Sequence, residues 1–448
     1  MKIKISREIL NDNMLRKLLS FFAIIFAIAL LSGCSKSSPT GPNGSPATVE
    51  GRVTGSSSSA GKMQKSSSTQ TGVQGATVIL AMIKADGSLQ TVSNAAVQTD
   101  ANGKFDVETN LSGISNLVVV ATQGASQWKA VITSQVQSGL KVYAEPLDDQ
   151  TTIKTNIFIK AKENNDGNVT YSEIGNYISS GIAAEIESDT TMENEVEASI
   201  NAEANAKATA ASNSSIGITQ AQWQSLISGE ADAEASLERN LYYANNQSDA
   251  DAAKGSYFQG MVNAYTNAGL SAGTYVKLME ISERVFINNT TNLNTQVAFS
   301  FEQRSEEFKA MAMSYAIQSS FTALGASQSQ MSDAITAGTN LAVSIKSALT
   351  ISDIDNDYET YRSAIEADMS VLLGMDSNMM TNMDANLSGY RATLEAAVST
   401  NVSVDAIVNA YSVFYSSVKT EMSSVMGTTN GTHLNAAAET MMILYANF

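Results

Sequence analysis

Side chains that commonly perform catalysis are scarce in this chain. His433 is the only histidine and Cys34 is the only cysteine, so a histidine-rich metal site and a His-Glu-x-x-His motif are excluded. Ser-x-x-Lys occurs, for example at Ser126, Ser138 and Ser416, without an accompanying Lys-Thr-Gly, and no Gly-x-Ser-x-Gly is present. The 44 acidic residues leave acid–base catalysis by paired carboxylates open, but a solvated acidic surface explains them more simply.

One loop carries oxygen-bearing side chains at ordered positions. These residues are Asn164, Asp166, Asn168, Thr170 and Glu173. With Gly167 at the sharp turn, the segment resembles the second part of an EF-hand loop, and this resemblance implies that the five residues bind calcium. Lys162 occupies the first ligand position, where an ammonium repels a cation. The alternative is an Asp-Gly turn that caps the next helix and joins two domains.

A short apolar segment follows five basic residues near the beginning of the chain. Residues 18–31 are apolar except for one serine, and as a helix they reach about 21 Å, less than the roughly 30 Å of a hydrocarbon core. Residues 31–34, Leu-Ser-Gly-Cys, resemble the lipobox of bacterial lipoproteins. The resemblance implies that residues 1–33 are a signal peptide and that Cys34 carries the lipid, including an amide-linked acyl chain such as palmitate.

Several consequences of this resemblance remain expectations. Ser35, where an aspartate would signal retention, implies the outer membrane, with the protein on the periplasmic or the cell-surface side. The start codon is Met1 or Met14, which heads a leader of more usual length. The alternative is an ordinary secretory leader with an incidental cysteine.

Composition narrows the possible partners. The net charge is −17, with 27 basic and 44 acidic residues, and this balance disfavours nucleic-acid binding. A single cysteine excludes an intramolecular disulfide. The hydrophobic fraction of 43% is typical of a globular protein.

The first part of the chain has the pattern of β-strands. We expect seven or eight short strands at regular spacing, which favours an antiparallel β-sandwich. Turns are expected at Asp86-Gly87 and Asn102-Gly103. The expected strands include 76–83, 117–121, 128–132, 140–144 and 151–159.

The same residues resemble the carboxypeptidase-regulatory-like family. The resemblance is carried by Val-x-Gly-x-Val at 49–53, by residues 72–78 (Gly-Val-Gln-Gly-Ala-Thr-Val) and by Thr-Asp-x-Asn-Gly-x-Phe at 99–105. It covers about residues 48–160 and implies a transthyretin-like sandwich that acts as an accessory module without catalysis. A Ser-rich insertion at 55–72 departs from the family pattern.

From about Tyr171 the apolar residues recur with helical period. Stripes run through 404–425, with Ser403 as N-cap, and through 369–398, while Thr219-x-x-Gln222 and Ser327-x-x-Gln330 are typical capping boxes. Residues 185–207 are rich in Ala, Glu and Asn, which indicates a solvated or peripheral helix. We expect seven to nine helices in an all-α bundle.

The predicted organisation is an N-terminal β-sandwich followed by a helical bundle. Its segments are a signal peptide (1–33), a flexible tether (34–47), the sandwich (48–160), an interdomain loop (161–175) and the helical domain (176–448). The leading functional hypothesis is a membrane-anchored envelope lipoprotein that binds a protein or an envelope polymer, or has a structural role, without catalysis or cofactor. The alternative is an envelope enzyme or accessory subunit that uses carboxylates of the helical domain.

Overall fold

The description rests on a computed structural model. It describes residues 45–55, 72–214, 216–289, 293, 295–399, 403–428 and 431–446. The predicted signal peptide, Cys34, most of the tether and residues 56–71 of the Ser-rich insertion lie outside the described residues. The contacts divide the chain into Met1–Ser45 and Pro46–Phe448, so the strands and helices belong to one unit.

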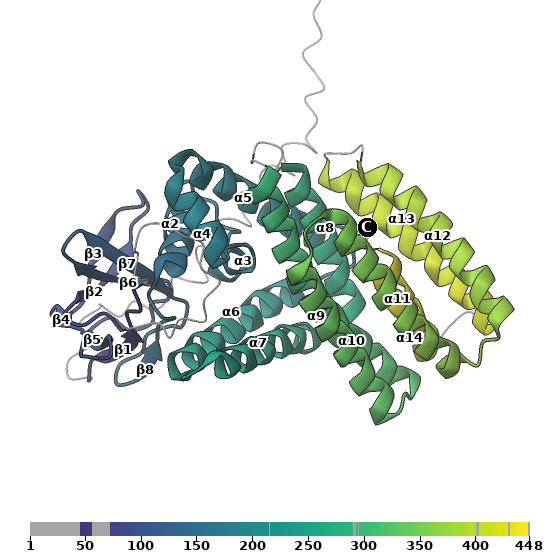
Figure 1. Ribbon diagram of the computed structural model, residues 1–448, viewed down its shortest axis with the longest axis horizontal. Coiled ribbons are helices and arrows are strands. Elements are labelled where there is room, and N and C mark those ends of the chain that lie inside the picture. The colour runs from purple at the N-terminus through teal and green to yellow at the C-terminus, as the bar shows by residue number, and fades with distance from the viewer. Residues whose placement is uncertain are drawn as a thin grey trace, which may run out of the picture. The chain divides into compact units, whose positions relative to one another are not determined.

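Eight strands in the described part of the chain form two sheets (Figure 1). They are β1 (Ala47–Arg52), β2 (Thr77–Ile83), β3 (Leu89–Thr91), β4 (Val97–Gln98), β5 (Lys104–Thr109), β6 (Leu117–Gln123), β7 (Ser126–Ile132) and β8 (Lys141–Tyr143). One sheet has the order β5-β1-β8, and the other has the order β3-β2-β6-β7, with β4 also paired to β2. Every pair is antiparallel except β1–β8, which is parallel, so the expectation of a purely antiparallel fold is wrong at this pair.

Strand β6 is buried on both faces, which explains its unbroken apolar sequence. Leu117 and Val119 face the core between the two sheets, together with Val49 of β1. Val118 and Val120 point to the opposite face, where they pack in a second cluster with residues of the helices. Because successive side chains of a strand alternate between faces, a strand buried on both faces needs apolar residues at every position.

The Val-x-Gly-x-Val segment has a packing role. Gly51 of β1 lies opposite Phe105 of β5 in the antiparallel register. A Cβ atom at Gly51 would lie only 2.2 Å from the Phe105 ring, so the ring occupies the space that any other residue would fill. The glycine and the aromatic residue therefore form one cross-strand packing unit.

The strand predicted at 151–159 is wrong, because these residues belong to helix α2 (Asp149–Glu163). Asp148 begins the helix with a capping box in which its side chain accepts a hydrogen bond from the backbone N–H of Thr151. Ile153, Ile157 and Ala161 recur every four residues and are buried. The β-branched composition favours a strand, but the cap and this helical stripe outweigh it. The change from strands to helices therefore occurs near residue 149.

Thirteen helices occur in the described residues, and twelve of them lie from Tyr171 onward, where seven to nine were expected. Those after α2 are α3 (Tyr171–Tyr177), α4 (Ser180–Ser188), α5 (Thr190–Ser212), α6 (Gln220–Tyr243), α7 (Gln247–Asn267), α8 (Ala272–Asn289), α9 (Thr295–Leu324), α10 (Gln328–Ser347), α11 (Ile351–Leu373), α12 (Ser377–Ser399), α13 (Val404–Met426) and α14 (Thr432–Tyr445). Short breaks at Ser179 and Asp189, whose side chains cap the following helices, separate α3, α4 and α5. Such breaks contain neither Gly nor Pro, so composition alone does not reveal them.

The signals for helix starts and faces were informative. The capping boxes at Thr219 and Ser327 are both present. Ser403 is the N-cap of α13, although its side chain makes no capping hydrogen bond. The stripe at 404–425 lies on one buried face of α13, whereas the stripe at 369–398 is divided between α11 and α12 by Gly374, a left-handed C-cap.

The expectation of a solvated helix over 185–207 is wrong. Most of these residues form α5, which buries apolar Val196 and Ile200 and also charged Glu203 and Lys207. The small alanines allow neighbouring helices to approach, so that the charged side chains lie inside the protein.

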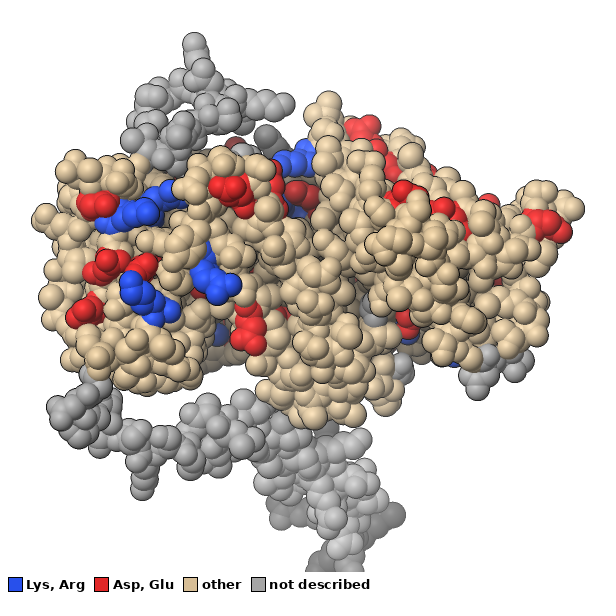
Figure 2. Space-filling view, turned by 90° about the horizontal axis from the view of Figure 1, so that it is seen from below, with Lys and Arg blue, Asp and Glu red and all other residues tan. Residues whose placement is uncertain are grey.

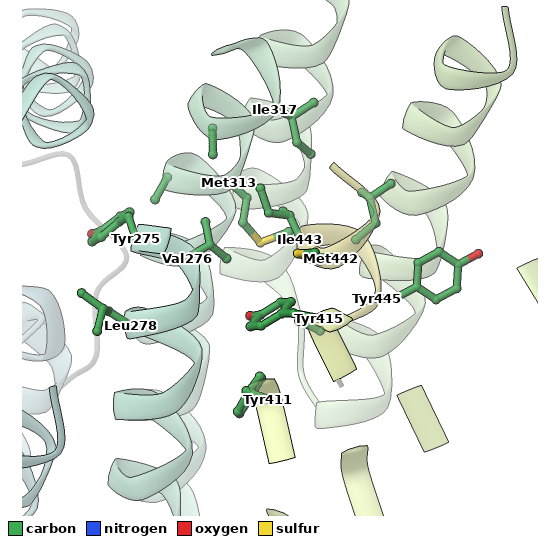
Figure 3. Close-up of a cluster of buried hydrophobic side chains, with 14 of the residues drawn as sticks. Tyr275, Val276, Leu278, Met313, Ile317, Tyr411, Tyr415, Met442, Ile443 and Tyr445 are labelled. Carbon is green, nitrogen blue, oxygen red and sulfur yellow. The ribbon is translucent and has the colours of Figure 1, made fainter. Parts of the chain in front are cut away.

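The C-terminal helix lies at the centre of the helical core. Figure 3 shows Met442 and Ile443 of α14 beside Met313 of α9 and Val276 of α8, with Tyr415 of α13 nearby. Nearly every residue of α14 from Leu434 onward is buried. A helix that is apolar on all sides requires neighbours on all sides, which α8, α9 and α13 supply. Within the described ranges, no helix combines the length and hydropathy that crossing a bilayer requires.

Candidate functional site

The predicted calcium loop is the junction of two helix caps. Asn165 adopts a left-handed conformation with φ of 62°, and its N–H donates to the carbonyl of Lys162. The N–H of Asp166 donates to the carbonyl of Ala161. These two bonds form a Schellman motif that ends α2. Four residues later, Thr170 begins α3 with a capping box.

The carboxylate of Glu173 already has partners. Its Oε2 accepts hydrogen bonds from the backbone N–H and the hydroxyl of Thr170, each at 3.0 Å. Its Oε1 lies 3.6 Å from Nζ of Lys207, which belongs to α5. A bidentate calcium contact at Glu173 would therefore compete with the start of α3 and with this ion pair.

The other predicted ligands point to α5 instead of to a common centre. Asn164 donates to Glu197, and Asn168 donates to Asn205 at 2.7 Å. Asp166 lies beside Glu197, whose pKa is raised to about 7, chiefly by desolvation and then by a hydrogen bond with Asp166. Lys162 donates to the carbonyl of Val169 within the loop itself. In the part of the chain that the structure describes, no group of three or more His, Cys, Asp or Glu residues is placed to hold a metal ion.

A polar cavity lies directly behind Glu173, between α3, α5, α6, α8 and α9. Its volume is about 30 Å³, enough for a water molecule but not for an organic substrate. Its wall includes four carboxyl groups and one ammonium, from Glu173, Glu203, Glu230, Glu283 and Lys207.

Lys207 neutralises one side of this cavity. Its Nζ lies 3.1 Å from Oε1 of Glu230 and also contacts Glu173. Glu203 has no ion pair as short as this one: Oε1 accepts a long bond of 3.4 Å from Ser282, and Oε2 is buried without a hydrogen-bond partner among the described residues. Tyr177 and the charge of Lys207 stabilise its ionised form only in part. Desolvation, followed by the charge of Glu173, raises the pKa of Glu203 to about 8. Burial therefore favours the protonated form of Glu203.

A second cluster centres on Lys309 of α9. Its Nζ lies 2.6 Å from Oε2 of Glu283 and 2.8 Å from Oε1 of Glu306. Glu280 is more distant, at 3.9 Å. Burial, partly opposed by the charge of Lys309, raises the pKa of Glu280 to about 8. Burial is also the main reason that the pKa of Glu306 is raised to about 7. Tyr358 of α11 donates to Glu306.

A third cluster joins the strands to the helices. Lys154 of α2 pairs with Glu145, which follows β8, at 2.7 Å. The ring of Tyr171 lies 4.4 Å from the Lys154 ammonium, and its hydroxyl donates to Glu145. From the helical side, Glu238 of α6 accepts a hydrogen bond from the backbone N–H of Thr133, just after β7.

Negative groups outnumber positive ones across these clusters. The buried residues are Glu145, Glu173, Glu203, Glu230, Glu234, Glu238, Glu280, Glu283, Glu306, Lys154, Lys207 and Lys309. Because so many charges of one sign cannot remain ionised away from water, several glutamates are protonated. Burial accordingly raises the pKa of Glu234 to about 7 and that of Glu238 well above its ordinary value.

Sequence reasoning identified Glu173 but missed the rest of this network. The sequence signal that could have identified the network is the regular spacing of charged residues within segments that otherwise consist mostly of small residues. Glu203 and Lys207 are four residues apart, and Glu230, Glu234 and Glu238 repeat with the same interval, so each set lies on one helix face.

A tyrosine cluster on the surface was also missed. Tyr143 of β8 meets Tyr242 and Tyr243 at the end of α6, with ring centroids 5.0–5.3 Å apart. The hydroxyls of Tyr143 and Tyr243 are 2.8 Å apart, and Tyr243 is 56% exposed. Lys104 lies 5.5 Å from the Tyr242 ring. Two segments a hundred residues apart build this cluster, so no local pattern predicts it.

Comparison of the chain with known protein families, with curated proteins and with solved structures gives no match.

Proposed function

We propose that this protein is a lipid-anchored lipoprotein of the outer membrane that binds an envelope polymer and performs no catalysis. The anchor is the lipid on Cys34, expected from the lipobox and the short apolar leader. The strands form a transthyretin-like sandwich that serves as a carboxypeptidase-regulatory-like accessory module, and the helices form a bundle. The core between the two sheets and the packing of Gly51 against Phe105 support this assignment.

The tyrosine cluster of Tyr143, Tyr242 and Tyr243 carries the binding proposal. Aromatic faces bind the C–H faces of sugar rings, while adjacent polar groups bind the hydroxyls. Here an ion pair between Glu50 and Lys141 lies next to the rings. Desolvation and the charge of Glu50 raise the pKa of Tyr242 to about 12, so its hydroxyl keeps its proton even at moderately alkaline pH.

A sedimentation assay with insoluble envelope glycan tests this proposal. We expect Tyr243→Ala to lower the fraction of protein bound, by roughly threefold to tenfold in affinity, because one stacked ring contributes about 0.5–1.5 kcal/mol. Tyr390→Ala, on α12 far along the chain, is the matched control and should bind like the wild type. Equal binding by both variants would remove the tyrosine cluster from the proposal, and capture of a protein alone would redirect it to a protein partner.

A second candidate is an envelope enzyme or accessory subunit that uses the buried carboxylates. The unpaired Oε2 of Glu203 at the cavity favours it, since a protonated carboxyl with a pKa near 8 suits a general acid. The volume of about 30 Å³ opposes it, because a substrate would need the helices to separate. Turnover of envelope glycan that disappears in Glu203→Gln would favour the enzyme, and absence of turnover in the wild type would favour the binding protein.

A further inference from the structure

A second cavity lies where α4, α7, α9 and α10 meet. It is separate from the tyrosine cluster and from the polar cavity behind Glu173, which we call the carboxylate cavity. Its volume is about 370 Å³, within the range of small-molecule sites. Ile182 and Val297 supply apolar wall, and Ser179, Ser180, Gln150 and Gln303 supply polar wall. The wall also contains two acidic residues, Glu185 and Glu307. This cavity is more than ten times larger in volume than the polar cavity behind Glu173. It therefore suits a small polar molecule.

Three basic side chains from three helices converge on this cavity. They are Lys254 of α7, Arg304 of α9 and Lys346 of α10. Only Arg304 has a carboxylate partner, with Nη1 2.7 Å from Oε2 of Glu307. Among the described residues, Lys254 and Lys346 form no ion pair.

The cations are close enough to affect one another. Desolvation lowers the pKa of Lys254, and the charges of Arg304 and Lys346 lower it further, while Glu307 and Asp251 partly oppose this shift. The Lys254 side chain is itself exposed to solvent. The Nε of Arg304 is buried and has no hydrogen-bond partner within the described part of the chain. A bound anion would relieve the repulsion and could accept from this donor.

Three basic residues against two acidic ones give the cavity wall a small excess of positive charge, in contrast with the acidic protein as a whole. The chain has a net charge of −17, and on the face in Figure 2 the basic side chains lie mostly toward the strands at the left. Lys346 also lies in the last turn of α10, where it stabilises the helix dipole, but Lys254 has no such role in α7. Stabilisation of helix ends therefore does not explain why three basic side chains lie at this cavity.

Helix α4 adds donors to the same cavity. Its first residues, Ser180 and Gly181, line the space, and their backbone N–H groups have no partner within the helix because they lie in its first turn. Gly181 leaves the backbone open, since a Cβ there would meet only the Ser179 hydroxyl, at 3.8 Å. The helix end reinforces the charge that the three basic residues supply.

We propose that this cavity binds the phosphomonoester group of a small polar molecule. Arg304 and Lys254 contact the phosphate oxygens, Lys346 adds charge at the opening, and the polar wall binds the rest of the molecule. Inorganic phosphate would occupy only part of the space, so an attached polar body such as a glycerol or a sugar completes the fit. The phosphomonoester can belong to a free molecule or to a lipid headgroup.

Isothermal titration calorimetry on the full chain in detergent tests the site with three probes. These are inorganic phosphate, glycerol 3-phosphate and dihexanoyl phosphatidate, with glycerol as the phosphate-free control. We expect glycerol 3-phosphate to bind more tightly than phosphate, glycerol not to bind, and affinity to fall as salt increases. Binding of phosphatidate alone would assign the group to a lipid headgroup, while binding of glycerol 3-phosphate would assign it to a free molecule.

The variants Lys254→Gln and Lys346→Gln separate the site from the general surface. Neither side chain has an ion pair to lose in the described residues, so both variants should fold, which circular dichroism checks. Lys254→Gln should lower the affinity about tenfold, through the loss of one charge-assisted contact, and Lys346→Gln should lower it by a smaller factor, through the loss of charge at the opening. Lys419→Gln, an exposed lysine of α13, should bind like the wild type. Equal affinity in all four proteins, or no binding of any phosphorylated probe, would overturn the proposal.

Discussion

The ammonium of Lys309 lies 2.6 Å from Oε2 of Glu283, and this ion pair joins α9 to α8 inside the protein. The other oxygen of Glu283 accepts a hydrogen bond from Ser305 at 2.6 Å. Glu283 also lines the polar cavity behind Glu173, which Lys207 lines as well. One glutamate thus connects two clusters that are each centred on a buried lysine.

Replacement of Lys309 by methionine should therefore destabilise the protein strongly. The variant keeps most of the apolar stem but leaves Glu283 and Glu306 buried without a counter-charge, a loss of about 3–5 kcal/mol. Chemical denaturation monitored by circular dichroism measures this difference. Lys419→Met at an exposed site should change stability by less than about 0.5 kcal/mol. Equal stabilities of the two variants would contradict a structural role for the Lys309 pairs.

Stability should fall as the pH rises from 6 to 9. The pKa of Glu203 is raised by burial from 4.5 to about 8, and that of Glu306 to about 7. Between the unfolded and folded pKa values the folded state binds more protons, so acid favours folding and the stabilisation is lost as pH rises through 7 and 8. We expect the melting temperature at pH 9 to be several degrees below that at pH 6.

The variant Glu203→Gln isolates one of these groups. Because glutamine cannot ionise, the variant should lose less stability between pH 6 and pH 9 than the wild type. Glu187→Gln, on the surface of α4, should keep the full pH dependence. A melting temperature that is independent of pH in the wild type would show that Glu203 and its neighbours are not held protonated.

Calcium should have little effect on the melting temperature. Glu173 already accepts two hydrogen bonds from Thr170 and contacts Lys207, so calcium would have to displace these partners. A calorimetric scan with about 10 mM calcium should match the scan without it, since a site weaker than about 10⁻³ M adds little stabilisation. A rise that Glu173→Gln abolishes and magnesium does not reproduce would instead establish a calcium site.

The lipid anchor has a direct test. Cys34→Ala should release the protein into the soluble fraction and abolish metabolic labelling with palmitate, because the proposed anchor places the lipid on that sulfur and the new amino terminus. Ser35→Ala is the matched control and should remain labelled. An unlabelled wild type would refute the anchor.

Local signals predicted local structure well. The capping boxes at Thr219 and Ser327 gave the starts of α6 and α10, and the stripe through Tyr411 gave the buried face of α13. Helix α2 was missed because Ile153 and Ile157 fit both a strand and a helix. Its Asp148–Thr151 cap decides between them.

The buried clusters were beyond such signals. The segment that contains Glu203 and Lys207 has the composition of a solvated helix. Only the packing of α5 against α8 places these two side chains inside the protein. The sequence shows the four-residue spacing of these charges but not which partners arrive from α3, α6 and α9. The same holds for Tyr143 and Tyr243, because contacts between distant segments depend on the complete fold.

Strand β1 is the first strand of its sheet in the sequence but lies in the middle of it, with β5 on one side and β8 on the other. A pull on the chain before Ala47 acts along this strand and loads both rows of hydrogen bonds in shear, so that they must break together. An edge strand would instead be peeled away one bond at a time. If the preceding residues are tethered to a membrane, the entry point of the chain is thus the place where the fold resists mechanical force most directly.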